Sequence, residues 1–70
     1  MDRISVNSTN LRSIGYDADA LILQVEFRDG SVWNYHGVAQ SLFDRLLHAS
    51  SKGSFFHDHI KDRFTARQVR

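Results

Sequence analysis

Apolar and polar residues alternate on both sides of Arg28-Asp29-Gly30, and this pattern predicts a β-hairpin. The first arm, residues 21–27, has apolar side chains at every odd position, and the second arm, residues 31–36, has Trp33 and Tyr35 at odd positions. The length of the turn decides whether the two sets share one face of the sheet. A shift of one residue in the pairing moves every side chain of a strand to the opposite face.

Two turn lengths lead to opposite positions for the aromatic pair. A two-residue loop at Asp29-Gly30 would place Trp33 and Tyr35 on the polar face. A three-residue loop with Gly30 in the left-handed conformation instead places Trp33 opposite Val25 and Tyr35 opposite Leu23. We favour the three-residue loop because it gives one continuous apolar face.

The same parity predicts a third strand before the hairpin. Residues 11–16 have Ile14 and Tyr16 on one side, and a turn at residues 17–20 sets Tyr16 opposite Leu21. Residues 1–9 are expected to form a polar lead-in with a short extended piece at residues 4–6. The sequence therefore predicts a three-stranded antiparallel meander in which residues 31–36 form an edge strand.

After residue 38 the spacing of apolar residues changes from two to about 3.6, which predicts helices at residues 39–49 and 54–64. Ser50-Ser51-Lys52-Gly53 separates them and offers a serine that can cap the second helix. An α+β fold, with both C-terminal helices packed on one face of the meander, satisfies these patterns. The shared core is expected to contain Ile14, Tyr16, Leu21, Leu23, Val25, Phe27, Trp33, Tyr35, Leu42, Phe43, Leu46, Leu47, Phe55, Phe56 and Ile60. The opposite face is expected to stay wet and holds Ser13, Gly15, Ile22, Gln24, Glu26, Val32, Asn34 and His36.

Size and composition narrow the class of protein. A chain of 70 residues is long enough for one domain only. The absence of cysteine excludes a disulfide and a thiolate zinc site. The longest apolar run, residues 20–23, is far shorter than the roughly 20 residues that cross a bilayer, and no signal-peptide core follows Met1. We therefore expect a single small cytoplasmic domain that does not contact a membrane.

Positive charge gathers at the C-terminal end, although the formal net charge of the chain is only +1. The last ten residues hold Lys61, Arg63, Arg67 and Arg70 against Asp62, so their net charge is 4 − 1 = +3. This excess favours a weak attraction to polyanions. The simpler interpretation is a solvated helix end, where the helix dipole also favours cations.

Several short segments resemble one known family. The segments are Ile14-Gly15-Tyr16-Asp17, Val25-Glu26-Phe27, Gly30-Ser31-Val32-Trp33-Asn34-Tyr35-His36-Gly37-Val38 and Ala49-Ser50-Ser51-Lys52-Gly53-Ser54-Phe55-Phe56. Over residues 8–64 the chain resembles the KTSC domain, a small module found alone in bacterial and phage-type proteins and at the C-terminus of some lysyl-tRNA synthetases. The function of this family is not established, and its attachment to a synthetase suggests RNA binding.

The resemblance has two departures and implies a set of motif residues. The family's central Tyr-x-Tyr falls on Trp33 and Tyr35, so a larger ring replaces the first tyrosine, and Ala39 stands where the family commonly has proline. The implied motif positions are Trp33, Tyr35, Ser51, Lys52 and Gly53. The implied organisation is a polar lead-in at residues 1–9, a KTSC-like domain at 10–64 and a basic flexible tail at 65–70.

The sequence favours no catalytic or metal chemistry. His57 and His59 are two residues apart on the second predicted helix and point in different directions, whereas a helical metal site needs a spacing of four. Ser51 and its serine neighbours lie at a helix junction, where serine usually acts as a cap. The four glycines are isolated and form no phosphate-binding run. We therefore expect no enzyme activity, metal, cofactor or small-molecule substrate.

Two binding functions fit the sequence. The first is weak RNA binding through a basic C-terminal helix, for which the expected contacts are Lys52, Lys61, Arg63, Arg67 and Tyr35. The second is protein binding or self-association, in which the edge strand at residues 31–36 extends a partner's sheet. The exposure of Trp33 and Tyr35 matters to this choice, because buried rings cannot stack on bases.

Overall fold

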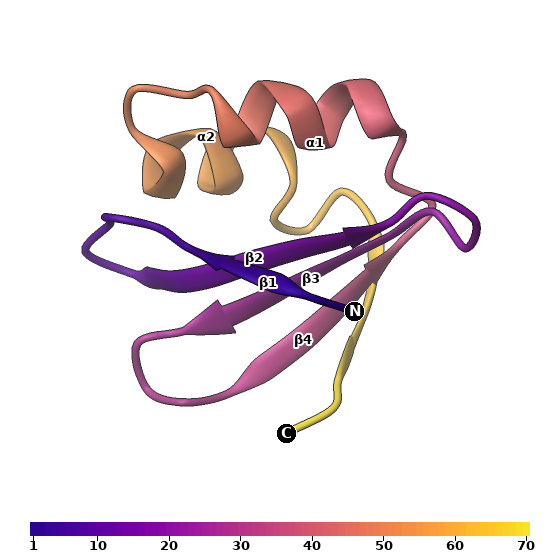
Figure 1. Ribbon diagram of the computed structural model, residues 1–70, viewed down its shortest axis with the longest axis horizontal. Coiled ribbons are helices and arrows are strands. Elements are labelled where there is room, and N and C mark those ends of the chain that lie inside the picture. The colour runs from indigo at the N-terminus through magenta and orange to yellow at the C-terminus, as the bar shows by residue number, and fades with distance from the viewer.

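The computed structural model describes residues 1–70 as one antiparallel sheet with two helices on one face (Figure 1). The five strands pair in the order in which they occur along the chain. In the sequence, both helices come after the fourth strand and before the fifth. The elements are β1 (Arg3–Ser5), β2 (Leu11–Asp17), β3 (Ile22–Phe27), β4 (Val32–His36), α1 (Gln40–Leu47), α2 (Lys52–His59) and β5 (Thr65–Gln68). The α+β class and the two helices on one face are confirmed, whereas the prediction of three strands is wrong.

The β3–β4 hairpin has the register that the three-residue loop predicts. Val25 pairs with Trp33, and Leu23 pairs with Tyr35. Gly30 has a φ of 90°, a left-handed conformation that side-chain-bearing residues rarely adopt. The turn closes with a hydrogen bond of 2.9 Å from the Phe27 N–H to the Ser31 carbonyl. Trp33 and Tyr35 therefore lie on the helix-covered face of the sheet.

The β2–β3 turn keeps the predicted parity and the predicted length of four residues, but it spans residues 18–21 in place of 17–20. Tyr16 pairs with Leu23, two residues beyond the predicted partner Leu21. Leu21 lies in the turn with a φ of 55°, and 45% of it is exposed, so it does not belong to the core. The expected pairing of Tyr16 with Leu21 is wrong, and the parity survives because the difference is an even number of residues.

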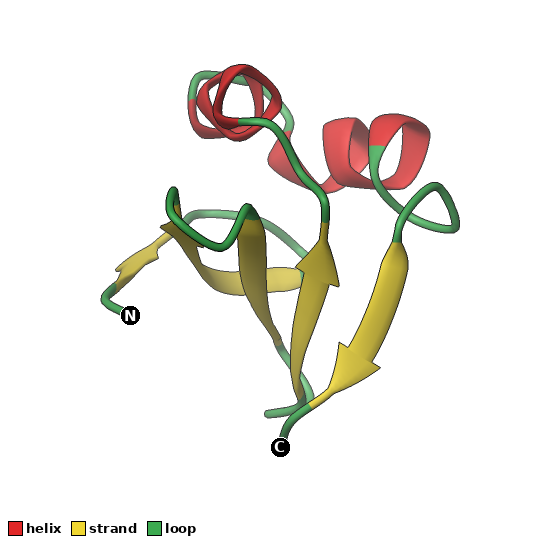
Figure 2. Ribbon diagram, turned by 90° about the vertical axis from the view of Figure 1, so that its right-hand side faces the viewer, coloured by secondary structure: helices red, strands yellow, loops and turns green.

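The two outer strands extend the sheet beyond the predicted meander. β1 pairs with β2, and the segment expected as a flexible tail forms β5 along β4 (Figure 2). Backbone hydrogen bonds continue past β5, since the Val69 N–H donates to the Val32 carbonyl at 2.8 Å and the Val32 N–H donates to the Arg70 carbonyl at 3.0 Å. The expectation that residues 31–36 form an edge strand is therefore wrong, because β5 occupies that edge.

Both helices are shorter than predicted. α2 begins at Lys52 after Ser51, whose hydroxyl accepts a hydrogen bond of 3.4 Å from the Ser54 N–H. It ends at His59, and Asp62 then adopts a φ of 62° that turns the chain back toward the sheet. Residues 61–64 thus belong to a turn and not to a basic helix, although Phe64 still packs against the core.

The core lies between the helices and one face of the sheet. Its buried members are Leu11, Ile14, Leu23, Val25, Tyr35, Val38, Leu46, Phe56 and Ile60. Leu11 and Val38 were not among the expected core residues, and Leu21 was wrongly included. Val32, expected on the wet face, is also buried because the backbone of residues 69–70 pairs beside it.

A polar cluster on the helix-free face binds residues from both ends of the chain, Arg3 and Arg70. The Glu26 side chain is only 12% exposed, and its carboxylate accepts a hydrogen bond of 2.9 Å from the Ser13 hydroxyl. The guanidinium groups of Arg3, Arg12 and Arg70 approach the same carboxylate at 4.0, 3.9 and 3.2 Å. A register shift between Leu11 and Ser13 in β2 lets Arg12 and Ser13 both reach Glu26.

Candidate functional site

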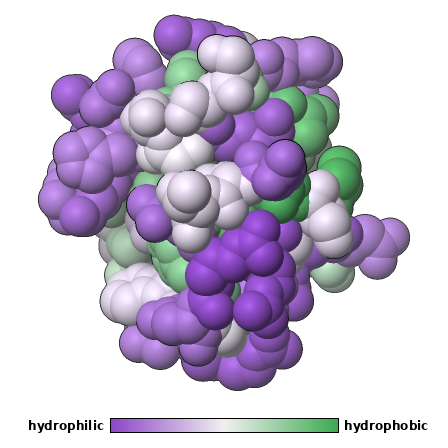
Figure 3. Space-filling view, turned by 90° about the vertical axis from the view of Figure 1, so that its left-hand side faces the viewer, coloured by the Kyte–Doolittle hydropathy of each residue, from purple (hydrophilic) through white to green (hydrophobic).

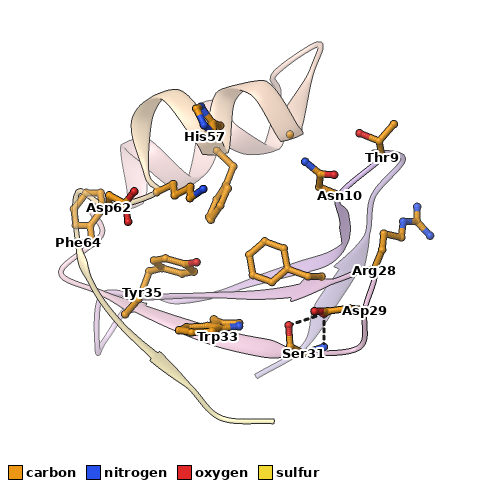
Figure 4. A pocket seen from close by; sticks show the side chains of 15 residues that line it. Thr9, Asn10, Arg28, Asp29, Ser31, Trp33, Tyr35, His57, Asp62 and Phe64 are labelled. Atoms are coloured by element: carbon orange, nitrogen blue, oxygen red, sulfur yellow. Dashed lines mark hydrogen bonds between the residues drawn. The ribbon is translucent and has the colours of Figure 1, made fainter.

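An aromatic pocket of about 580 Å³ opens between the β3–β4 hairpin, α2 and the turn that follows α2 (Figure 4). We define the aromatic pocket by its ring side chains and by the charged groups around them. The rings are Phe27, Trp33, Tyr35, Phe56 and Phe64, and the charged or titratable groups are Arg28, Asp29, His57, Lys61 and Asp62. Segments far apart in the sequence thus supply one concave surface.

The wall of the pocket consists of three rings in contact. The ring of Phe56 lies 5.3 Å from that of Tyr35 at 81° and 5.5 Å from that of Phe27 at 71°. These edge-to-face contacts fix the rings, because aromatic pairs prefer that geometry. Trp33 lies on the same sheet face as Tyr35, two residues earlier in β4, and remains half-buried. Its indole is therefore a large, partly exposed ring that a ligand in the pocket can reach.

Two polar groups of the pocket lack a partner within the protein. The Tyr35 hydroxyl and the Trp33 indole N–H form no hydrogen bond with another protein group, and neither atom is sealed from solvent. The Tyr16 hydroxyl, by contrast, donates to the Val38 carbonyl at 2.5 Å. Burial raises the pKa of Tyr35, and the nearby Asp62 carboxylate raises it further, so the hydroxyl stays protonated at neutral pH. The pocket thus offers two free donors.

The charged groups of the pocket come from two turns. Arg28 is held at the hairpin turn, where its backbone N–H donates to the Asn10 carbonyl at 2.9 Å and its Nε donates to the Ser8 carbonyl at 3.2 Å. Lys61 is exposed in the turn after α2. Asp29 is engaged by Ser31, whose hydroxyl and N–H donate to its carboxylate at 2.6 and 2.9 Å and lower its pKa.

A polar depression of about 570 Å³ adjoins the aromatic pocket. The two share Thr9, Asn10, Gly53 and His57, and no hydrophobic residue lines the depression. Its other members are Asn7, Ser8, Ser50, Ser51, Lys52, Ser54 and Asp58. Figure 3 views the side of the molecule on which α2 and the β3–β4 turn lie, where hydrophilic residues cover most of the surface and hydrophobic residues show between them and along one edge. The two concavities form one continuous surface.

The structure separates the residues that the sequence grouped as one nucleic-acid site. Tyr35 and Lys61 line the aromatic pocket, and Lys52 lines the polar depression, where its Nζ donates to the Ala49 carbonyl at 3.1 Å. Arg63 donates from its Nε to the Asp58 carbonyl at 3.1 Å. Arg67 pairs with Asn34 in β5, so its side chain lies on the helix-free face. The predicted basic C-terminal helix is absent, because α2 ends at His59. The basic side chains assigned to that helix lie on different sides of the molecule.

The motif residues and the missed residues meet at the two concavities. Trp33 and Tyr35 lie in the aromatic pocket, Ser51 and Lys52 in the polar depression, and Gly53 in both. Sequence reasoning missed Arg28 and His57 as lining residues of the pocket that holds Tyr35. The only sequence feature that could have indicated Arg28 is the three-residue hairpin loop. Arg28 is the first residue of that loop, which lies at the end of the sheet that α2 covers.

No group of three His, Cys, Asp or Glu side chains is arranged to hold a metal ion. Neither helix has the length and the apolar character needed to cross a membrane.

The fold and the site define a small α+β domain with an aromatic pocket on the helix-covered face of its sheet. The chain belongs to the KTSC domain family, whose family model matches residues 7–64. It superposes with a TM-score of 0.96 on the crystal structure of a KTSC domain protein from Yersinia pestis, at 36% identity over 99% of this chain and 97% of the other. The expected family resemblance is confirmed.

Relatives include short proteins and parts of large ones. An uncharacterized protein of Stutzerimonas stutzeri is 39% identical over 61 residues, which are 87% of this chain and 86% of the relative. A lysine–tRNA ligase of Trichormus variabilis is 34% identical over 59 residues, which are 84% of this chain and 10% of the ligase. The domain thus corresponds to one small part of that enzyme.

Proposed function

We propose that this KTSC domain is a non-catalytic module that binds single-stranded RNA weakly on the side that holds the aromatic pocket. The observation that supports this function best is the partly exposed ring of Trp33 in an open pocket that the hydroxyl of the buried Tyr35 also reaches, with Arg28 and Lys61 among the lining residues. Aromatic rings next to cations are the usual means by which proteins bind unpaired nucleotides. The ligases that contain a similar segment are also named for an RNA, which agrees with this ligand class.

The expected binding is electrostatic in large part. Arg28, Lys61 and Lys52 line the two adjoining concavities and can contact phosphates of one strand. Three such contacts would give a slope of about −2 in a plot of log K against log salt, because each phosphate contact with a single strand contributes about −0.7. Asp62 and Asp58 line the same surface and keep the attraction weak.

Fluorescence anisotropy of a labelled twelve-nucleotide RNA tests this function. Lys61→Ala should weaken binding and reduce the salt slope by about 0.7. Arg67→Ala is the matched control, because it removes the same charge from the helix-free face. Equal losses in the two variants, or affinity that does not change with salt, would contradict RNA binding at this surface.

Protein binding through a sheet edge is the second candidate. β5 is one of the two edge strands of the sheet, and all four of its residues are exposed, so its outer backbone groups can pair with another strand. This edge replaces the one that the sequence placed at residues 31–36. Sedimentation equilibrium at increasing protein concentration distinguishes this candidate, since self-association raises the apparent mass with little dependence on salt.

A further inference from the structure

We propose that the aromatic pocket holds one unpaired nucleobase, with the adjoining phosphates directed toward Arg28 and Lys61. This inference rests on the proposed RNA-binding function and names the part of the ligand that the pocket receives. Binding would then need a nucleotide free of base pairing, because a base inside a duplex cannot enter a pocket of this kind.

The size and the wall of the pocket suit a flat ring. A volume of about 580 Å³ lies within the range of roughly 300–1,000 Å³ that is typical of small-molecule sites. Phe27 and Tyr35 contact Phe56 edge to face, whereas Trp33 has no such ring partner and offers a half-buried indole as a stacking surface. Stacking on such a ring is tolerant of base identity, because every base has a π-face.

The two free donors favour a base over an aliphatic side chain. The Tyr35 hydroxyl and the Trp33 indole N–H line the pocket without a protein partner. An aliphatic ligand would cover these groups and leave them unpaired, which opposes binding. A nucleobase carries ring nitrogens and carbonyl oxygens at its edge, and these can accept both hydrogen bonds.

The position of the cations agrees with a nucleotide that enters by its base. Arg28 comes from the hairpin turn and Lys61 from the turn after α2, so two cations line the pocket from separate elements. Figure 4 shows the Arg28 side chain at the rim of the pocket, on the side of Thr9. Asp29 forms no ion pair with either cation, and its carboxylate accepts two hydrogen bonds from Ser31. The polar depression continues from the pocket through Gly53 and offers a path for the next nucleotide toward Lys52.

The intrinsic fluorescence of Trp33, the one tryptophan of the chain, reports directly on this site. We would titrate the full chain with a ten-nucleotide oligouridine RNA and with a ribose-phosphate oligomer of equal length that lacks bases. The uridine oligomer should quench Trp33 and bind about ten-fold more tightly than the abasic oligomer, as expected for the loss of one stacked base. An RNA duplex should leave Trp33 unquenched.

The possible outcomes separate the base pocket from the wider RNA-binding function. Equal binding of the two oligomers without quenching would overturn the base pocket and leave RNA binding intact. Failure of both oligomers to bind would overturn both. A change in Trp33 fluorescence that grows with protein concentration in the absence of RNA would assign the pocket to a second copy of the chain.

Tyr35→Phe provides an independent test that keeps the fold. The hydroxyl makes no hydrogen bond within the protein, so its removal should leave the free energy of unfolding nearly unchanged. Affinity for oligouridine should fall about five-fold, while affinity for the abasic oligomer should stay constant. Tyr16→Phe is the matched control, because that hydroxyl bonds to Val38 away from the pocket. Unchanged affinity of Tyr35→Phe for oligouridine would remove Tyr35 from base recognition and overturn the proposed donor pair.

Discussion

At the scale of single residues, Gly30 determines on which face of the sheet the aromatic pocket can form. Its left-handed backbone closes the three-residue turn that places Trp33 opposite Val25. No atom lies within 4 Å of the position that a Cβ would take there. The cost of a side chain at Gly30 is therefore conformational and not steric.

Gly30→Ala should lower the free energy of unfolding by about 1–2 kcal/mol, the usual cost of a left-handed backbone for a residue with a Cβ. Chemical denaturation monitored by Trp33 fluorescence measures this loss. Gly30→Asn is the matched variant and should lose less, because asparagine tolerates the left-handed region better. An alanine variant as stable as the parent would show that the turn has another conformation.

Ionisation of Tyr35 should make the free energy of unfolding depend on pH in the alkaline range. The pKa of Tyr35 in the folded state is raised by burial and by Asp62, whereas in the unfolded chain it is about 10. The unfolded chain therefore loses its proton first. The contribution of Tyr35 is complete below the unfolded pKa and is lost as pH rises through the folded pKa.

The unfolding free energy of the parent should thus decline above about pH 10. Tyr35→Phe should decline less steeply, although Tyr16, whose pKa is raised by burial and by Asp17 and Asp44, still contributes. Denaturant titrations at several alkaline pH values measure the difference. A spectrophotometric midpoint for Tyr35 at or below the ordinary tyrosine value would refute the burial argument.

At the scale of secondary-structure elements, the predictable parts are those with a strong local period. The alternation in β3 and β4 and the apolar stripe of α1 identified these elements. β5 has the sequence Thr-Ala-Arg-Gln, with no alternation, and it forms because β4 offers a row of backbone partners. The spacing of Phe55, Phe56, Ile60 and Phe64 extended α2 too far, because Phe64 reaches the core from a turn.

Removal of residues 65–70 should convert β4 into an exposed edge. The backbone groups of β4 that pair with β5 would be free, and the buried side chain of Val32 would become accessible. An uncovered edge strand promotes pairing between molecules, so the shortened chain should be less stable and should associate at lower concentration than the full chain. Analytical ultracentrifugation of both proteins measures this change. Identical sedimentation and stability would show that β5 contributes little to the sheet.

At the scale of the whole molecule, the candidate site was only partly predictable. Tyr35 and Lys61 were identified from residue type, and both line the pocket. Arg67 was assigned to the same site because it follows Lys61 in a basic stretch, but the pairing of β5 places it on the other face. Phe56 and Arg28 line the pocket because α2 packs over the hairpin, and no local sequence pattern predicts that packing.

Both ends of the chain are fastened on the helix-free side, where Arg3 and Arg70 reach the same Glu26 carboxylate. The concave surface under α2 opens on the other side. A linker, an affinity tag or a bead attached at either terminus would therefore emerge away from the mouth of the pocket. The domain can be tethered to a solid support or to a larger polypeptide by either end while its ligand entrance stays unobstructed.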